Sequence, residues 1–420
     1  MKKKIILGVL IFSLAGFLMY QTIQAAEENL YENLKIFTDA MALVKVEYVK
    51  NVNAKDLIYG ALKGMLSSLD SHSQFLDPDT YKEMQVETKG KFGGLGIVIS
   101  LKDNHLTIIS PLEGTPAYRS GIKANDWIVK INGETTKDIT LTEAVKKLRG
   151  PKGTQVTITI MREGEGKLLD FTITRDIIKI ESVKNVQVLE DEIGYVRLAE
   201  FQEKTGEALK KALLKLKDED IKALILDLRN NPGGLLNEAV KAADKLLPKG
   251  KLIVYTQGRD KEDIRKYFSR EEPIFSNLPM VILINGGSAS ASEIVAAAVQ
   301  EWHGGVLLGT DSFGKGSVQS ILPLKDGSAL RLTTAKYLTP QGVSIQDVKV
   351  KPDILVEISE EDEIGLMRQA ELGQEEREKL QKEDQWAKDI QLERAKDLLK
   401  AMEVYQQKLQ RKEEPALSPK

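Results

Sequence analysis

The sequence predicts a mixed α/β fold, in which an α/β core carries an inserted β-rich module and has helical segments at both ends. Three observations support this prediction. Apolar runs of strand length alternate with helical stretches over 178–357, which is typical of an α/β core. Short strand-like runs with turn signals between them fill 89–177. The flanking segments 26–88 and 358–420 carry apolar residues at helical spacing.

Residues 1–25 predict a signal peptide or a membrane anchor. Three lysines at 2–4 precede an uncharged apolar run over 5–20, and Ala25 and Ala26 supply small residues at a cleavage point. The run is slightly shorter than the roughly 20 residues that a membrane span needs. Cleavage is therefore favoured, and an uncleaved anchor stays open as the alternative. Both export the remaining chain, to the periplasm or to the outer face of the cytoplasmic membrane, and membrane contact is expected only through this segment.

Composition excludes several kinds of chemistry. Among 420 residues there is no cysteine and there are three histidines, at 72, 105 and 303. Disulfides, thiolate zinc sites and cysteine nucleophiles are excluded, and we expect neither a metal nor a cofactor. The net charge of −2 provides no basic field, so nucleic acid is not an expected partner.

The elements of the two central regions follow from their apolar patterns. In the β-rich module we expect strands over 95–101, 106–110, 127–131, 156–161 and 168–174 and a short helix over 142–148. In the core we expect strands over 195–198, 223–228, 252–255 and 280–284, helices over 204–217, 236–247 and 293–302, and hairpins about 325–327 and 341–342. Asn132-Gly133 is a strong tight-turn signal.

The C-terminal segment is densely charged and is predicted to be helical from 361 to 412. One apolar stripe is predicted there, made of Trp386, Ile390, Leu398, Met402, Tyr405 and Leu409. A helix that packs on the surface of its own chain and a contact between two chains both fit this stripe.

A serine-rich turn lies between an apolar strand and an alanine-rich helix. It reads N-G-G-S-A-S-A-S-E from Asn285 to Glu293. A tight turn between strand and helix is how α/β enzymes present a nucleophile, and amides at a helix start can stabilise an oxyanion. Ser290 and Glu293 also spell a capping box. On these residues alone, a helix cap is the commoner use of such serines.

A glycine-rich segment over 309–319 contains Lys315 and allows several interpretations. A phosphate loop, G-x-x-x-x-G-K, is disfavoured because Gly316 stands where a hydroxyl must bind magnesium. A second interpretation pairs Lys315 with a serine distant in sequence, as a general base whose pKa burial has lowered. A solvated loop lysine is the plain alternative.

A dyad of the S-x-x-K type is the remaining interpretation of this segment. Ser312 and Lys315 have the required spacing, but the motif needs one helical turn, which the neighbouring glycines oppose. Ser120 and Lys123 match the spacing too, with a glycine between them.

Three motifs have to be read together. They are L-D-L-R-N-N-P-G-G at 226–234, S-A-S-A-S-E at 288–293 and F-G-K-G-x-x-Q at 313–319. With them the sequence resembles the C-terminal processing peptidases, or tail-specific proteases, of serine peptidase family S41, from about residue 30 to 355. That family places a lysine 25 residues after its nucleophilic serine and a glutamine four residues further on, which here selects Ser290, Lys315 and Gln319.

The resemblance implies a mixed-sheet peptidase core of the ClpP/crotonase-like kind and a role for each site residue. Ser290 would attack the scissile carbonyl, and neutral Lys315 would take its proton and pass it to the leaving amine. Gln319 would hold the lysine, and the backbone N–H groups of Gly234 and Ala291 would form the oxyanion hole. Asn230 and Asn231 are interpreted as turn formers, and no histidine is needed: His72 is expected to be structural, His105 solvated, and His303 uninvolved.

The β-rich module resembles a PDZ domain, in which Gly94, Leu95, Gly96 and Ile97 stand in place of the carboxylate-binding loop. Successive amides there would bind a chain-terminal carboxylate, and the next strand would pair with the peptide. The module could instead be a spacer or lid, and Arg149 is either a coupling residue or an ordinary helix-end charge. Expected partners are proteins or peptides with apolar C-termini, and an adaptor protein and a homodimer stay open. The alternative function is an inactive PDZ scaffold that presents clients to other factors.

Overall fold

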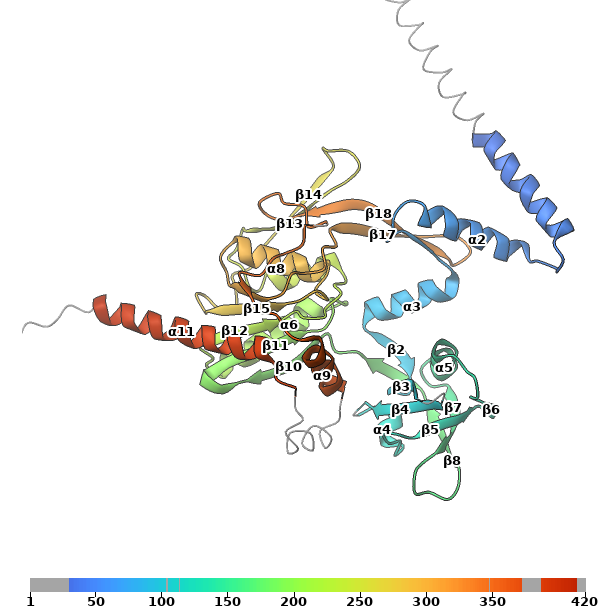
Figure 1. Ribbon diagram of the computed structural model, residues 1–420, viewed down its shortest axis with the longest axis horizontal. Helices are drawn as coiled ribbons and strands as arrows, with labels where there is room; N and C mark the ends of the chain where they lie inside the picture. Colours follow the sequence, from blue (N-terminus) through green and yellow to red (C-terminus); the bar gives the residue numbers. More distant parts are fainter. Residues whose placement is uncertain (1–29, 103–104, 113, 347, 372–386, 414–420) are drawn as a thin grey trace, which may run out of the picture. The chain divides into compact units, whose positions relative to one another are not determined.

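The computed structural model describes residues 30–102, 105–112, 114–346, 348–371 and 387–413 (Figure 1). They form two compact units, one made of the residues up to 79 with 320–333 and the other of 80–319 with the residues from 334 onward. The predicted signal segment at 1–25 lies outside the described residues. Within the described ranges, no helix is both long and apolar enough to cross a membrane.

The first unit combines helices with one short strand. Residues 30–47 are helical, and α2 (Ala54–Ser67) follows, capped by the Asn53 side chain, which accepts a hydrogen bond from the Lys55 N–H at 2.9 Å. Strand β1 (Gln74–Leu76) pairs antiparallel with residues 329–331 of β18 (Ala329–Leu338). The sequence did not predict β1, because three residues are too few to show a period and the partner lies far along the chain.

Several polar contacts hold the N-terminal segment to the hairpin of β17 (Ser317–Pro323) and β18, and one of them is at the tip of the hairpin. The Tyr59 hydroxyl donates to Asp326 at 2.8 Å, and Ser328 donates to the same carboxylate through its N–H and its hydroxyl. These bonds lower the pKa of Asp326 to about 2. The hairpin predicted about residues 325–327 is therefore confirmed, and its tip is an anchoring point.

The second unit contains the β-rich module. Its five main strands form an antiparallel sheet in the order β3-β4-β5-β7-β8, β6 pairs with β5, and β2 pairs with β9. The bounds are α3 (Pro78–Lys89), β2 (Lys91–Gly94), β3 (Ile97–Lys102), β4 (His105–Pro111), α4 (Pro116–Arg119), β5 (Trp127–Ile131), β6 (Glu134–Thr135), α5 (Leu141–Leu148), β7 (Gln155–Met161), β8 (Leu169–Thr174) and β9 (Asp176–Lys179). Strand β3 begins at Ile97 rather than at the predicted 95, since Leu95 and Gly96 form a loop.

The core of the second unit is built on a six-stranded sheet in the order β10-β11-β12-β15-β16-β19. All neighbouring pairs are parallel except β10 with β11. The bounds are β10 (Val183–Val188), β11 (Ile193–Leu198), β12 (Ala223–Asp227), β15 (Met280–Ile284), β16 (Val306–Gly309) and β19 (Ile354–Leu355). β13 (Leu252–Gln257) joins β14 (Ile264–Phe268) and the end of β18 in a second sheet. The mixed α/β prediction is confirmed.

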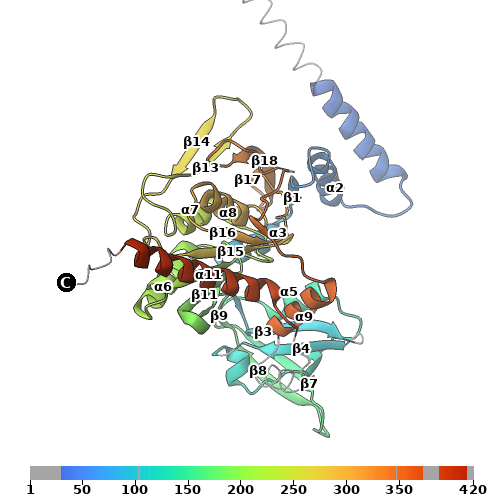
Figure 2. The ribbon, with the colours of Figure 1, turned by 60° about the vertical axis from the view of Figure 1, so that its left-hand side comes forward.

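The two faces of this sheet are covered by different helices, because alternate residues of each strand point to opposite sides. Leu226 and Ile282 belong to the core cluster that includes α6 (Thr205–Asp218), α7 (Leu236–Ala243) and α8 (Ala291–Glu301). Their neighbours Ile225 and Val281 belong to a second cluster with residues of α11 (Ile390–Glu413). Figure 2 shows α11 along one face, with α7 and α8 on the other.

The helical C-terminal segment is confirmed, but its predicted apolar stripe is partly wrong. The buried residues of α11 are Gln391, Ala395 and Leu399, flanked by Leu392, Leu398 and Met402. Ile390 and Tyr405 are exposed, and Trp386 lies outside the described residues. Because charged residues occur all along this segment, the sequence does not show which side of the helix is buried. The shorter helix α9 (Glu360–Glu371) precedes α11.

Candidate active site

Ser290 lies in the tight turn between β15 and α8, and its backbone conformation is strained. Its φ of 55° and ψ of −109° lie outside the regions that residues with a Cβ favour, and the residue is only 6% exposed. Ala291 is the first residue of α8, so its N–H belongs to the helix-start donors that have no intrahelical acceptor. A hydroxyl and an available amide therefore lie side by side.

The three serines of this turn have different hydrogen-bond partners. The Ser288 hydroxyl donates to the carbonyl oxygen of Leu228 at 2.8 Å, and the Ser292 hydroxyl donates to that of Asn231 at 2.9 Å. Both side chains thus join the turn to the neighbouring loop through the main chain. The Ser290 hydroxyl makes no such bond to a main-chain carbonyl among the described residues, and it lies near enough to the Tyr337 phenol to influence its pKa. This difference distinguishes Ser290 from its neighbours.

A glycine loop that follows β12 approaches the nucleophile turn closely. A Cβ on Gly233 would lie 2.8 Å from the Ser290 Cβ and 3.0 Å from the Ala291 nitrogen, and φ there is +102°. At Gly234, with φ of +139°, a Cβ would lie 2.2 Å from the Phe201 carbonyl oxygen. Only glycine fits such positions. Among the described hydrogen bonds the Gly234 N–H has no acceptor, as an oxyanion donor requires.

Asn231 joins this loop to the nucleophile turn. It is fully buried, and its side-chain oxygen accepts a hydrogen bond from Gly233 N–H at 2.9 Å. Its carbonyl oxygen accepts from Ala289 N–H at 3.0 Å and from the Ser292 hydroxyl. Asn230, with φ of +56°, is a turn former as predicted. Asn231 does more than that, and no motif in the sequence marks these contacts.

One buried carboxylate links the nucleophile turn to the lysine segment. Glu293 is fully buried in the first turn of α8, and its Oε2 accepts hydrogen bonds from the backbone N–H of Ser290 at 2.7 Å and of Lys315 at 2.9 Å. Its Oε1 accepts from Gly314 N–H at 2.7 Å and from the Ser312 hydroxyl at 2.5 Å. The capping-box glutamate therefore holds together two segments that the sequence separates by about 25 residues.

Lys315 and Gln319 belong to the second of the two segments that Glu293 joins. Lys315 is half-buried in the loop before β17, between the buried residues Gly314 and Gly316, and a Cβ on Gly316 would lie 2.2 Å from the Gln346 nitrogen. Gln319 is on β17, and its side-chain amide donates to the Ser317 hydroxyl at 2.8 Å. The loop is not helical, and Ser312 donates to Glu293 rather than serving an S-x-x-K dyad.

Tyr337 is a residue of the site that sequence inspection missed. It lies on β18, is 4% exposed, and donates its backbone N–H to Gly316 at 2.7 Å. Burial raises the pKa of Tyr337 to about 12, although the influence of the nearby Ser290 hydroxyl acts in the opposite direction. The phenol therefore stays protonated at neutral pH. No motif marks it, because it reaches Ser290 only through strand pairing.

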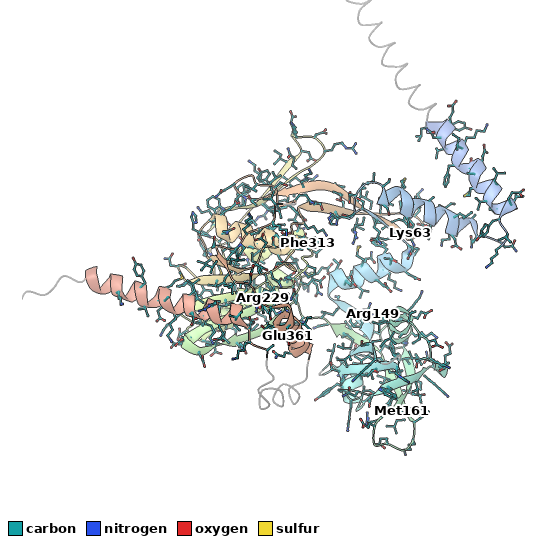
Figure 3. The ribbon with its side chains drawn as sticks, viewed as in Figure 1. Lys63, Arg149, Met161, Arg229, Phe313 and Glu361 are labelled. Atoms are coloured by element: carbon teal, nitrogen blue, oxygen red, sulfur yellow. The ribbon has the colours of Figure 1, made fainter. Side chains whose placement is uncertain are left out.

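The proposed carboxylate loop of the β-rich module borders a small groove. The groove has a volume of about 80 Å³, and its lining consists of Phe92, Gly94, Leu95, Gly96, Ile97, Ile99, Val145, Leu148 and Arg149. Gly96 has φ of +78°, and a Cβ there would meet Thr115 at 2.3 Å. Arg149 ends α5, and its guanidinium lies 4.4 Å from the centre of the Phe92 ring; Figure 3 labels it.

The histidines lie apart from these contacts. The His72 carbonyl accepts from Arg331, and the exposed His105 ring stacks on Trp127 with 4.5 Å between centroids. His303 is exposed just after α8. Within the described ranges, no group of three or more histidine, aspartate or glutamate side chains could hold a metal ion.

Known families match three parts of the chain. The model of peptidase family S41 matches residues 192–356, that of the PDZ domain matches 83–161, and that of the activating protease CtpB N-terminal domain matches 18–80. The PDZ match falls on the β-rich module and the S41 match on the core sheets.

Named relatives are similar over most of the chain. The carboxy-terminal-processing protease of Bartonella bacilliformis is 46% identical over 335 residues, which cover 79% of this chain and 76% of that protein. Carboxy-terminal processing protease CtpA of Bacillus subtilis is 37% identical over 316 residues, 75% of this chain and 67% of that protein. Among solved structures, the photosystem II D1 C-terminal processing protease is 30% identical with a TM-score of 0.45, covering 76% of this chain and 92% of that one.

The fold and these relatives define a serine peptidase with a mixed α/β core. The chain belongs to peptidase family S41, and it carries a PDZ domain.

Proposed function

We propose that the chain is an exported serine endopeptidase that binds protein C-termini through its PDZ domain and cleaves with Ser290, Lys315 and Gln319. The Ser290 Oγ attacks the scissile carbonyl carbon while its proton passes to the neutral Lys315 amine. Lys315 then protonates the leaving amine as the C–N bond breaks. Water, deprotonated by Lys315, then attacks the acyl ester. The bond between the acyl carbon and the Ser290 Oγ breaks, Lys315 returns the proton to that oxygen, and the new C-terminus is released.

Charge that develops on the carbonyl oxygen is stabilised by two backbone N–H donors, those of Ala291 and Gly234. Ala291 offers its N–H at the start of α8, where the helix dipole also favours negative charge. Gly234 contributes an N–H without an acceptor among the described residues. Both donors are backbone groups held by the fold, so they need no reorganisation during the reaction.

The observation that carries this proposal is the shared carboxylate of Glu293. Its Oε2 accepts from the N–H groups of both Ser290 and Lys315, so one oxygen fixes the backbones of the proposed nucleophile and base together. A glutamate that only capped the helix would accept from Ser290 N–H and would not need the additional bond from Lys315 N–H. Gln319, four residues after Lys315 on the regular strand β17, would steady the lysine amine.

The PDZ groove supports an apolar C-terminal residue as the recognised feature. Ile97, Ile99, Val145 and Leu148 line it, and the loop at Leu95 and Gly96 precedes the edge strand β3, on which a peptide could add as a further strand. The partners are then proteins or peptides with apolar tails. An adaptor and a homodimer are compatible with this scheme.

The decisive experiment measures cleavage of a reporter protein that ends in an apolar tail. Wild type should cleave it, and Ser290→Ala should not. Ser288→Ala, the same change in the same turn, should retain a measurable rate. Lys315→Ala and Lys315→Arg should both be inactive, since arginine cannot act as a neutral base. Undiminished cleavage by Ser290→Ala would make the assignment wrong.

A second reporter tests the role of the PDZ domain. The same protein with its C-terminal carboxylate amidated should be cleaved more slowly through a higher KM, whereas equal rates would remove the PDZ domain from substrate selection. Export is tested separately by fractionating cells that express the full chain and by determining the N-terminal residue of the mature protein. Retention in the cytoplasm would contradict the proposed localisation.

A further inference from the structure

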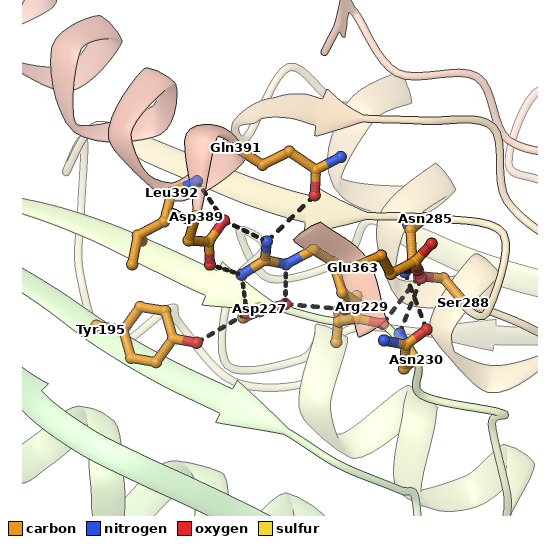
Figure 4. Close-up of polar contacts among 11 residues, drawn as sticks. Tyr195, Asp227, Arg229, Asn230, Asn285, Ser288, Glu363, Asp389, Gln391 and Leu392 are labelled. Carbon is orange, nitrogen blue, oxygen red and sulfur yellow. Dashed lines mark hydrogen bonds and ion pairs between the residues drawn. The ribbon is translucent and has the colours of Figure 1, made fainter. Parts of the chain in front are cut away.

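A buried ion pair connects the C-terminal segment to the end of β12. The Arg229 guanidinium donates to Asp389 through Nη1 and Nη2, each at 2.7 Å. It also donates to Asp227 through Nε at 3.0 Å and Nη2 at 2.7 Å. Gln391 accepts a further bond from Nη1 at 3.1 Å. Figure 4 shows the guanidinium between the strand and the start of α11.

These charges are held away from solvent. Asp227 is fully buried, and the side chains of Arg229 and Asp389 are 10% and 20% exposed. Burial opposes ionisation of Asp227, but the Arg229 charge and its hydrogen bonds, with one from Tyr195, outweigh it and lower the pKa of Asp227. Removal of one partner from such a pair leaves a buried charge uncompensated.

Arg229 directly precedes the glycine loop that supplies the proposed oxyanion donor. The loop contains Asn230, Gly233 and Gly234 with φ of +56°, +102° and +139°. Because glycine has many accessible conformations, the course of this loop depends on the contacts that its ends and side chains make. The bidentate contact with Asp389 therefore fixes the loop at its first residue.

Helix α9, the other helix of the C-terminal segment, is connected to the next residue of the loop, Asn230, through Asn285. Asn285, at the start of the nucleophile turn, accepts from Asn230 N–H at 2.8 Å and donates to the Asn230 side chain at 2.9 Å. The same Asn285 amide donates to Glu363 of α9 at 3.1 Å. Both loops beside Ser290 are thus in hydrogen-bond contact with residues from beyond the S41 match.

We infer that Asp389 is a positioning residue for catalysis, which holds Arg229 and through it the glycine loop. The C-terminal segment is then a support of the active site and not only a cover for the sheet. The inference rests on the proposed function in one respect, namely that Gly234 N–H acts as an oxyanion donor.

The first test measures loop order directly and does not require peptidase activity. Hydrogen–deuterium exchange of full-length Asp389→Asn should be about tenfold faster than wild type in peptides covering 229–236, and unchanged in peptides covering α6. Asp397→Asn is the matched control, because Asp397 lies on α11, shortly after Asp389 in the chain, and its ion pair among the described residues is with exposed Arg394 at 3.5 Å. Wild-type exchange at 229–236 in Asp389→Asn would overturn the inference.

The second test separates positioning from loss of folded enzyme. Asp389→Asn should lower kcat about tenfold with KM within twofold, and it should weaken inhibition by a peptide boronic acid by the same factor. The boron atom forms a bond to the Ser290 Oγ, and the resulting anionic oxygen needs the same donors as the transition state. Asp397→Asn should match wild type in all three values. Faster exchange at 229–236 with an unchanged kcat would also overturn the inference.

Two other results would each require a further measurement before the inference can be judged. If Asp389→Asn accelerates exchange in α6 as well, its effect is global, and Gln391→Ala decides, because it removes a single acceptor from Arg229. Faster exchange confined to 229–236 in Gln391→Ala supports the inference, and unchanged exchange overturns it. If Ser290→Ala cleaves as fast as wild type, the proposed function fails, and the exchange data alone then decide whether Asp389 positions the loop.

Discussion

The carboxylate of Glu293 accepts a hydrogen bond from the backbone N–H of Lys315 at 2.9 Å, although the two residues belong to different elements. The same oxygen accepts from Ser290 N–H. Glu293→Gln would replace one oxygen by an NH₂ group that cannot accept, so at least one buried donor would lose its partner. Each such loss costs about 1–3 kcal/mol.

We therefore expect Glu293→Gln to lower both the free energy of unfolding and the rate of cleavage, the latter by about 10²-fold, because small displacements of reacting groups are costly. Denaturant unfolding and steady-state kinetics measure the two effects. Glu301→Gln is the control, since Glu301 lies on the same helix and accepts one exposed bond from Gln341. Equal rates for the two variants would refute a role for Glu293 in alignment.

Gly233 should not tolerate a methyl group. Gly233→Ala would place a Cβ 2.7 Å from the Ala289 carbonyl oxygen and 2.8 Å from the Ser290 Cβ, at a φ of +102°. We expect at least a 10²-fold loss of kcat and destabilisation by more than about 1 kcal/mol. Gly286→Ala in the neighbouring turn, where a Cβ would meet nothing within 4 Å, should be nearly neutral. A Gly233→Ala variant as active as Gly286→Ala would contradict the close approach.

The Tyr337 hydroxyl should contribute to the reactivity of Ser290. Tyr337→Phe removes the hydroxyl near Ser290 and leaves the buried ring, so we expect kcat to fall between about 3- and 10-fold with an unchanged melting temperature. Tyr267→Phe, on strand β14 of the same sheet, is the control.

The raised pKa of Tyr337 predicts how the rate loss in Tyr337→Phe depends on pH. Because the pKa of Tyr337 is raised to about 12, the phenol stays neutral across pH 6 to 9, and the ratio of wild-type to Tyr337→Phe rates should be constant there. A ratio that changes within this interval would show that a titrating group near pH 8 acts through the tyrosine.

Asp326 provides a test of stability against pH. Its pKa is lowered from 3.8 to about 2 by hydrogen bonds from Ser328 and Tyr59. A depressed pKa contributes stability that is present above pH 3.8 and is lost as the pH falls toward 2. Wild type should therefore melt higher than Asp326→Asn at pH 7, and the difference should shrink as the pH falls from 4 to 2.

A double-mutant cycle isolates this contact. Tyr59→Phe and Asp326→Asn should not be additive, because each removes the same bond. Additive changes in melting temperature at pH 7 would show that the two side chains act independently.

The sequence predicts what depends on local pattern and fails where distant residues meet. The strands β12 and β15 were predicted because each is an apolar run of strand length, and the spacing of Ser290, Lys315 and Gln319 marked one site. β1 was missed because its partner strand follows more than 250 residues later. Capping-box spacing marked Glu293, but its bonds to Gly314 and Lys315 arise only when β16 lies beside β15.

The same limit explains why some residues of the site could not be predicted from the sequence. Tyr337, Asn231 and Asp389 occur in no motif, and each acts through a contact that tertiary structure creates. The direction of α11 against the sheet was also not determined, since charged residues surround its apolar positions. Burial by a neighbouring element, rather than local preference, selects Ala395 and Leu399.

The strained backbone of Ser290 has an evolutionary consequence. Glycine adopts positive φ without a steric penalty, so Ser290→Gly should be more stable than Ser290→Ala and at least as stable as the active protein. A substitution that ends catalysis would then cost the fold nothing. Gene copies released from selection for cleavage could lose the serine early while their PDZ groove persists, and lineages descended from such copies would survive as binding proteins.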